Sequence, residues 1–330
     1  MTAHSSTVFS VRFQGINKMA FYLGIDTSNY TTSVSVYNDE TNEIYQAKKL
    51  LPVKEGSLGL RQSDAVFHHT VQLPQMFDEL FGNKEFTLSG VGVSVSPRDE
   101  VGSYMPCFLA GVSAAKAISN VNKIPLHTFS HQAGHIAAAL YSSDSLDLID
   151  KEFIAFHLSG GTTEALLVKP HKEKIFDITL VAKTLDLKAG QAIDRVGVMM
   201  GLQFPCGKEL DKLSLESKKE YKIKPTMKGA DCCLSGIENK CEKMIRDGEE
   251  KEDVAKYCIT YIERTLEEMT KSLLEKYDNL PLVYAGGVMS NSIISRDFKK
   301  KFSGRFATAE FSSDNAAGVS ILTSITEKRK

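Results

Sequence analysis

The sequence predicts an α/β protein made of two βββαβα halves with a cleft between them. The same order of strand and helix patterns occurs twice along the chain, and each half opens with a strand meander that contains a polar or glycine-rich turn. The length of 330 residues is sufficient for two domains. Because the residues of the two halves barely resemble each other, the repeat is one of architecture.

The first half covers residues 21–130. It opens with a meander of three strands, whose first turn is the polar segment 26–31. Helices and strands then alternate, and Pro97 ends one of the strands because proline lacks a backbone N–H. The expected elements are strands at 21–25, 32–37, 44–50, 90–96 and 124–129, and helices at 63–80 and 101–118.

The second half covers residues 131–313. It repeats the meander, now with a Gly-Gly turn, and continues with helices around one more strand. The expected strands are 153–158, 164–168, 175–181 and 282–285, and the helices 190–200, 234–244, 254–276 and 290–300. A last helix at 314–325 lies in the segment 314–330, which we assign to the first domain. We expect a disordered leader at 1–20 and an exposed, lysine-rich insertion at 214–228.

Composition is that of an ordinary soluble globular protein, with 42% hydrophobic and 25% charged residues. The net charge of −1 gives no global basic field, so any contact with nucleic acid must come from a local patch. Six cysteines without a Cys-x-x-Cys pair favour reduced thiols and a cytoplasmic location. No apolar run reaches membrane-spanning length, so no membrane contact is expected.

Two histidines, His131 and His135, stand four residues apart on an expected helix that follows a strand. At this spacing both imidazoles face the same way and can reach one divalent ion, and Asp314 offers a third ligand. The structural alternatives are two partly buried histidines bonded to backbone, and an N-cap at Ser313-Asp314. A His-Glu-x-x-His metalloprotease is excluded because Gln132 stands where the general base is required.

Glycine-rich turns indicate a nucleotide in the same cleft. The turn at 158–164 lets backbone N–H groups approach phosphate, with a type I′ hairpin as the alternative. Asp26, in the matching turn of the first half, could hold a metal-bound water or nucleotide-bound Mg²⁺. Gly286-Gly287 would allow close approach of a nucleoside to which Asn291 bonds. Asp194 follows a glycine early in a helix and either caps it or binds ribose.

The two-half pattern resembles the actin/sugar kinase/Hsp70 superfamily, with its actin-like ATPase (ASKHA, RNase H-like) fold. More specifically, residues 21–325 resemble the tRNA N6-threonylcarbamoyladenosine transferase family (TsaD/Gcp-like, formerly described as O-sialoglycoprotein endopeptidases). The motifs that carry the resemblance are Gly24-Ile25-Asp26-Thr27-Ser28, His131-x-x-x-His135, Ser159-Gly160-Gly161, Gly190-x-Ala192-x-Asp194, Ser235-Gly236, Gly286-Gly287-Val288-x-x-Asn291 and Ser313-Asp314-Asn315-Ala316-Ala317.

The resemblance implies an acyltransferase that moves a threonylcarbamoyl group from threonylcarbamoyl-AMP to N6 of the adenosine next to the tRNA anticodon. It implies one divalent metal ion, iron or zinc, together with an ATP- or AMP-type nucleotide. Implied partners are tRNA, a smaller homologous protein and an ATPase. The helix at 101–118, with its face of small residues, is the candidate docking surface for the smaller protein, with internal packing as the alternative. The implied site residues are Asp26 and Ser159 as catalytic groups; His131, His135 and Asp314 as metal ligands; and His157, Leu158, Ser159, Gly160, Gly161, Asp194, Gly207 and Asn291 as nucleotide or substrate contacts.

Several positions depart from the family's usual pattern. Carboxylates and an imidazole of the cleft are replaced at Asn29-Tyr30-Thr31-Thr32, Gln132 and Thr162, and the Gly-Pro-Gly loop by Ser96-Pro97-Arg98. These changes indicate a divergent paralogue. They leave open a carbamoyl or acyl transferase that acts on a small molecule, and a nucleotide-binding, non-catalytic regulatory protein.

Overall fold

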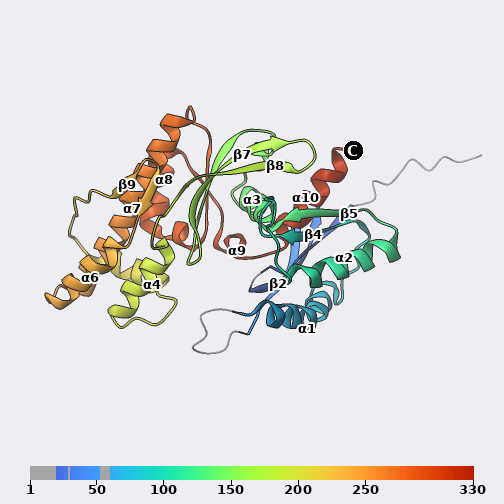
Figure 1. Ribbon diagram of the computed structural model, residues 1–330, viewed down its shortest axis with the longest axis horizontal. Coiled ribbons are helices and arrows are strands. Elements are labelled where there is room, and N and C mark those ends of the chain that lie inside the picture. The colour runs from blue at the N-terminus through green and yellow to red at the C-terminus, as the bar shows by residue number, and fades with distance from the viewer. Residues whose placement is uncertain (1–19, 29, 53–59) are drawn as a thin grey trace, which may run out of the picture.

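The computed structural model describes residues 20–28, 30–52 and 60–330, so all but the last residue of the expected leader at 1–20 lies outside them. Within these ranges the chain forms two five-stranded sheets with helices around them. Figure 1 shows α4, α6, α7 and α8 gathered at one end of the molecule and the first sheet with α1 and α2 at the other. No helix of the described residues is long and apolar enough to cross a membrane.

The first sheet has the strand order β3-β2-β1-β4-β5. Its first three strands form an antiparallel meander, and β4 and β5 run parallel to β1. Helices α1 and α2 pack against it, as does α10 from the other end of the chain, and β2 is therefore buried along its whole length. The bounds are β1 (Phe21–Asp26), β2 (Thr31–Asn38), β3 (Glu43–Leu50), β4 (Leu88–Ser96), β5 (Leu126–Ser130), α1 (Gln62–Phe81), α2 (Phe108–Asn122) and α10 (Ala317–Lys328).

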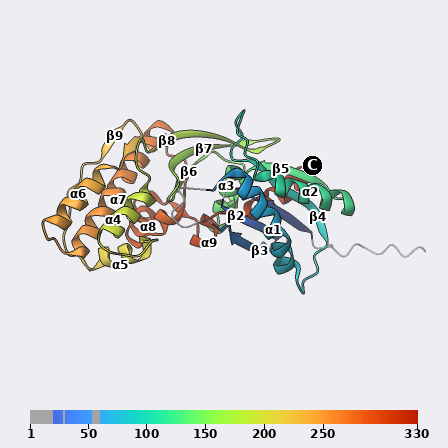
Figure 2. The ribbon, with the colours of Figure 1, turned by 60° about the horizontal axis from the view of Figure 1, so that its bottom comes forward.

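The second sheet repeats that topology in the order β8-β7-β6-β11-β12. Its meander is again antiparallel, and β11 runs parallel to β6 as β4 does to β1. A helical layer covers the face away from α3 (His131–Ser142) (Figure 2). The bounds are β6 (Phe153–Leu158), β7 (Thr163–His171), β8 (Ile175–Lys183), β11 (Leu282–Ala285), β12 (Arg305–Phe306), α4 (Ala189–Met199), α5 (Gly207–Glu216), α6 (Gly236–Arg246), α7 (Lys251–Lys276) and α8 (Ser292–Phe302).

Short elements complete the described chain. They are the hairpin of β9 (Thr226–Lys228) and β10 (Asp231–Cys233), the 3₁₀ turns η1 (Leu146–Leu148) and η2 (Gly287–Ser290), and α9 (Ala309–Ser312). The predicted α/β architecture of two like halves is confirmed by the matching strand orders. The domain boundary at residue 130 and the assignment of 314–330 stay predictions.

Three expectations about helices were wrong. The helix expected at 101–118 begins at Phe108, because Gly102 has φ +83 and Pro106 cannot continue a preceding turn. The last helix begins at Ala317, which leaves Asp314 in the turn before it. Part of the expected insertion at 214–228 belongs to α5, whose Ser214 is fully buried. That helix is hard to see in the sequence because so few of its residues are apolar.

A charged cluster joins α7 to α8 and makes a testable contribution to stability. Glu267 is buried and binds Lys301 at 2.9 Å and Lys271 at 3.0 Å. Burial raises the pKa of Glu267, but the hydrogen bonds to the two lysines outweigh it and lower the pKa from 4.5 to about 2. The carboxylate therefore stabilises the fold above its unfolded pKa, and this stabilisation is lost as the pH falls toward 2.

We expect Glu267→Gln to lower the free energy of unfolding by about 1–2 kcal/mol at pH 7 and by less than half of that at about pH 3. Urea titrations at both pH values measure this loss of unfolding free energy. The matched control is Glu268→Gln, because Glu268 binds the same Lys271 but is 45% exposed, and it should cost less than about 0.5 kcal/mol. An equal cost of Glu267→Gln at both pH values would contradict the ion-pair assignment.

Candidate active site

The site begins at the carboxyl end of β5, where α3 starts without an intervening loop. Ser130 is the N-cap of α3, and its Oγ accepts a hydrogen bond of 3.2 Å from the Ala133 N–H. The Gln132 N–H donates to the carbonyl of Pro97 at the end of β4, 3.0 Å away. His131 and His135 thus lie in the first turns of a fixed helix, with ring centroids 4.3 Å apart.

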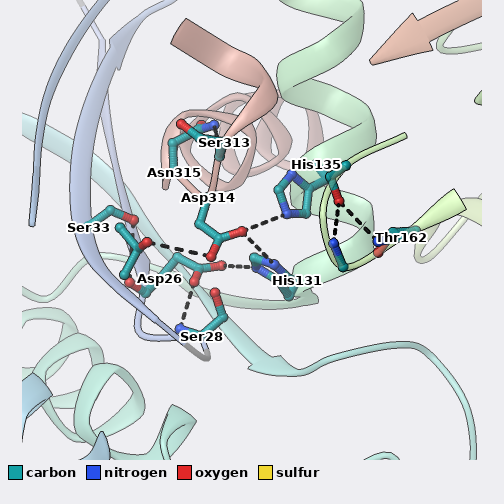
Figure 3. A network of polar contacts seen from close by, with 12 residues as sticks. Asp26, Ser28, Ser33, His131, His135, Thr162, Ser313, Asp314 and Asn315 are labelled. Atoms are coloured by element: carbon teal, nitrogen blue, oxygen red, sulfur yellow. Dashed lines mark hydrogen bonds and ion pairs between the residues drawn. The ribbon is translucent and has the colours of Figure 1, made fainter. Parts of the chain in front are cut away.

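Helix α10 crosses α3 between the two histidines. A Cβ on Gly318 would lie 1.8 Å from the Gly134 carbonyl oxygen, so glycine is required at this crossing. The turn that precedes α10 is thereby held against α3. Its Asp314 places Oδ1 3.2 Å from His135 Nε2 and 3.6 Å from His131 Nε2 (Figure 3).

The other nitrogen of His131 is fixed by Asp26 at the end of β1. Asp26 is buried, and its Oδ2 lies 2.8 Å from His131 Nδ1 and also accepts a hydrogen bond from Ser94. Its Oδ1 accepts from the Ser28 N–H at 2.8 Å. Asp26 therefore orients an imidazole. It does not line the cavity described below, where the predicted Mg²⁺-nucleotide contact would require it.

The electrostatics of the cluster follow from close opposite charges. Burial lowers the pKa of His131, but Asp26 and Asp314 outweigh it and raise the pKa to about 10. Burial raises the pKa of Asp314, yet the hydrogen bonds from both histidines lower it well below its usual range. Burial and the neighbouring charges on His135 and His131 lower the pKa of His157 to about 3, so that its ring is neutral at pH 7.

The residues fit a divalent metal ion. One ligand atom each from His131, His135 and Asp314 lies within 4.8 Å of the others. Two imidazoles and one carboxylate are a ligand set that zinc and iron accept, and the hydrogen bond to His131 Nδ1 directs its Nε2 toward the cluster. His157 adds a third ring, whose centroid lies 5.2 Å from that of His135.

The glycine turn joins β6 to β7 beside this cluster. Gly160 and Gly161 do not have positive φ, so the turn is not the type I′ hairpin that the sequence left open. Ser159 Oγ accepts from the N–H groups of Gly161 at 3.3 Å and Thr162 at 3.1 Å. A Cβ on either glycine would meet no atom within 4 Å, so this face of the turn is open, while the Gly160 nitrogen lies against Gly190 of α4.

A cavity of about 540 Å³ lies between the two halves and includes the cluster. Side chains of both sheets line it, most of them apolar. From the first half come Tyr30, Arg98 and Phe108, and from the second half Ser159 and Glu164, together with the two histidines of α3 and Asp314. Asn29, one of the altered positions, lies outside the described residues.

The predicted nucleotide residues Asp194, Gly207 and Asn291 form a separate group that does not line this cavity. Asp194 lies inside α4, whose N-cap is Lys188, so the capping expectation was wrong. Its Oδ1 accepts from the Cys206 N–H at 2.9 Å, next to Gly207 at the start of α5. Asn291 caps α8 through Oδ1 and donates to Asp211 of α5 at 2.8 Å.

At Gly286 the expected close approach is made by the protein itself, whereas a Cβ on Gly287 would meet no atom within 4 Å. Gly286 has φ +100, and a Cβ there would lie 2.1 Å from the carbonyl oxygen of Leu158. The side chain of Leu158 is buried in the core. Only its backbone is therefore placed to contribute to a site, and its carbonyl faces Gly286.

Sequence reasoning missed three polar side chains near the predicted groups. Ser94 binds Asp26, Asp211 binds Asn291, and Arg98 forms an ion pair with Glu164 at 2.9 Å. Arg98 could have been flagged, because it directly follows a strand at the sheet edge where ligands bind. Asp211 was hidden because the helix that carries it was not recognised.

Comparisons with known proteins agree on one family. Residues 51–321 match the family model described as TsaD, tRNA N6-adenosine threonylcarbamoyltransferase. The protein of that name from Dictyoglomus turgidum is 32% identical over 84% of each chain. The one from a Sulfurihydrogenibium species is 29% identical over 90% of this chain and 88% of its own.

A likeness to a solved structure confirms the predicted actin-like fold. The ROK family glucokinase of Streptomyces griseus, in complex with glucose and AMPPNP, superposes with a TM-score of 0.52. The match covers 93% of this chain and 100% of the glucokinase, at 10% identity. At that identity the likeness concerns the fold alone.

The α3–α10 crossing gives a test of how the cluster is positioned. We expect Gly318→Ala to destabilise the fold by about 1–3 kcal/mol, because the added methyl group forces the helices apart. It should also lower the amount of zinc retained, by displacing Asp314. Thermal unfolding and metal analysis measure both effects.

The matched control is Gly236→Ala at the start of α6, where the nearest atom to a new Cβ is 3.5 Å away. That variant should change the free energy of unfolding by less than about 0.5 kcal/mol and should leave the zinc content unchanged. Normal stability and zinc content in Gly318→Ala would show that the crossing does not position Asp314.

Proposed function

The chain belongs to the family of tRNA N6-adenosine threonylcarbamoyltransferases, which are acyl-transferring enzymes, and from this we propose its reaction. It transfers a threonylcarbamoyl group from threonylcarbamoyl-AMP to N6 of the adenosine next to the tRNA anticodon. The observation that carries the proposal is the convergence of His131, His135 and Asp314 beside the open turn at Ser159. The site and the tRNA substrate support a cytoplasmic location.

We assign the ligand set of one divalent ion, iron or zinc, to His131, His135 and Asp314. Such an ion would polarise the acyl carbonyl and stabilise the charge that develops on its oxygen. Of the three ligands, Asp26 contacts His131, and it holds Nδ1 so that Nε2 faces the cluster. It is a positioning residue in this proposal, because its carboxylate is buried behind the imidazole.

We assign binding of the adenylate to the turn after β6 and to the group around α4 and α5. The open backbone at Gly160 and Gly161 suits phosphate or acyl oxygens, and the Ser159 hydroxyl can donate a further hydrogen bond. Asp194 Oδ2 has no hydrogen-bond partner among the described residues, which suits a ribose hydroxyl. Asn291 has less hydrogen-bonding capacity left for a ligand, because its Nδ2 already donates to Asp211 and its Oδ1 already accepts from the Ile293 N–H.

The outer face of α1 and α2 is the surface that we assign to the smaller homologous partner. Phe67, Val71 and Leu109 are exposed there. A groove between the two helices is lined by small and apolar residues, namely Thr70, Leu73, Pro74, Phe77, Ala110, Ser113, Ala114 and Ala117. An amphipathic helix of a partner would fit it. The ATPase partner is proposed from family membership.

A second candidate function is acyl transfer to a small molecule. It is favoured by the Arg98–Glu164 pair, which lines the cavity where the family's usual sequence has a Gly-Pro-Gly loop and an uncharged residue. A third, the non-catalytic regulatory paralogue, shares the same fold and nucleotide group, and like the second candidate it predicts no product in the tRNA assay below.

The test of the proposed reaction uses the metal-loaded full-length protein with its partners, threonylcarbamoyl-AMP and unmodified tRNA. Mass spectrometry of the digested tRNA should show the modified adenosine with the wild type. We expect at least a hundredfold less product with His131→Ala, since the ligand set is broken. No product with the wild type, while metal and nucleotide remain bound, would contradict tRNA as acceptor.

A separate test concerns the ligand set. Metal content measured by mass spectrometry should fall to background in His131→Ala and Asp314→Ala, with unchanged circular dichroism. Asp26→Asn should weaken zinc affinity by about 10- to 100-fold, because it removes the charge behind His131. The control is His127→Ala, since His127 pairs with Glu327 of α10 away from the cavity. Full metal occupancy in Asp314→Ala would overturn the assignment.

A further inference from the structure

Arg98 is held rigidly beside the cluster by its own backbone. It follows Pro97 at the carboxyl end of β4. Its N–H donates to Ser103 Oγ at 3.0 Å, and its carbonyl accepts from Ser96 Oγ at 3.0 Å. Because the preceding carbonyl of Pro97 binds the start of α3, the loop and the helix that carries His131 form one unit.

The partner of Arg98 comes from the other half of the molecule. Glu164 of β7 lies directly opposite His157 of β6 in the antiparallel register, so both side chains lie on the same face of the second sheet. Its Oε2 is 2.9 Å from Arg98 Nη2, and its side chain is only 11% exposed. Glu164 therefore fixes the guanidinium next to His157 and the cluster.

Most of the hydrogen-bonding capacity of Arg98 remains available. A guanidinium has five N–H donors, and within the described ranges Glu164 is the one acceptor bonded to it. The Arg98 side chain is 35% exposed and lines the same cavity as His131 and Ser159. A fixed cation with free donors at the wall of a largely apolar cavity is suited to bind an anion.

We propose that Arg98, held by Glu164, is the anchor for a free carboxylate on the acyl group that the cavity accepts. This inference rests on the proposed function, because a carbamoyl group built on an amino acid retains the carboxylate of that amino acid. The planar fork of a guanidinium matches a carboxylate with two parallel hydrogen bonds. Arg98 then determines which acyl groups are accepted, since neutral ones cannot make this contact.

A carboxylate suits this position better than the phosphate of free AMP, the anion compared with it below. Glu164 lies against the guanidinium and repels a second anion, and this repulsion is about twice as large for the dianion of free AMP as for a carboxylate. A phosphate also has the open turn at Gly160 and Gly161 available. The two sources of negative charge can be separated by experiment.

The test measures binding of N-carbamoyl-L-threonine, of its methyl ester and of AMP to the zinc-loaded full-length protein by isothermal titration calorimetry. We expect Arg98→Ala to weaken binding of the acid by about 10- to 100-fold and to leave the ester and AMP unchanged. Arg98→Lys, which keeps the charge but loses the fork, should give an intermediate loss for the acid alone.

The matched control is Arg305→Ala. Arg305 is 36% exposed and pairs with one carboxylate, Asp147, outside the cavity, so its loss should leave all three ligands unaffected. Equal weakening of acid and ester by Arg98→Ala, loss of AMP in place of the acid, or no binding of the acid to the wild type would overturn the proposal.

These binding measurements need no tRNA, so they separate the inference from the proposed reaction. A selective loss of the acid in Arg98→Ala would support the carboxylate anchor even if no modified tRNA were formed. In that case the assignment of tRNA as acceptor would be wrong, and the assignment of Arg98 to the acyl group would be right. If the wild type forms modified tRNA but the Arg98→Ala variant binds the acid normally, the proposed reaction would stand and the carboxylate anchor would be wrong.

Discussion

The crossing of α3 and α10 at Gly134 and Gly318 is the contact on which the site depends. The two helices are separated by more than a hundred residues in sequence, yet their backbones meet so closely that no side chain fits between them. The histidines lie one turn apart on one helix, and Asp314 precedes the other. A small shift of one close-packed helix moves the other. The Gly134–Gly318 crossing therefore sets the geometry of all three ligands, although it bonds to none of them.

A second constraint is the buried charge of Asp26. An isolated carboxylate in that position would be very unfavourable, and its hydrogen bonds from Ser94, Ser28 and His131 compensate for the loss of water. The end of β1, the end of β4 and the start of α3 are therefore tied to one side chain. This explains how a residue that does not line the cavity is still essential to its shape, and why the first sheet positions ligands that lie beside the second.

Altered positions line the cavity from both halves of the molecule. Ser159, Gly160, Gly161 and the three clustered ligands keep the family's residues, whereas Arg98, Gln132, Thr162 and Glu164, which line the cavity, depart from them. Arg98 and Glu164 come from different halves, and their opposite charges form an ion pair across the cavity wall. In the function proposed above, this paired replacement changes what the site binds and leaves the fold unchanged.

The sequence by itself determined the two like halves, nine of the twelve strands of the described residues, and the pairing of His131 with His135, because these follow from periodicity and from local spacing on a helix. It also identified Asp314, through a motif resemblance. Tertiary structure alone decided that Asp26 faces His131, that the nucleotide residues form a separate group, and that Arg98 meets Glu164. Such contacts join residues far apart in the chain, and their geometry depends on how sheets and helices pack, which no local pattern specifies.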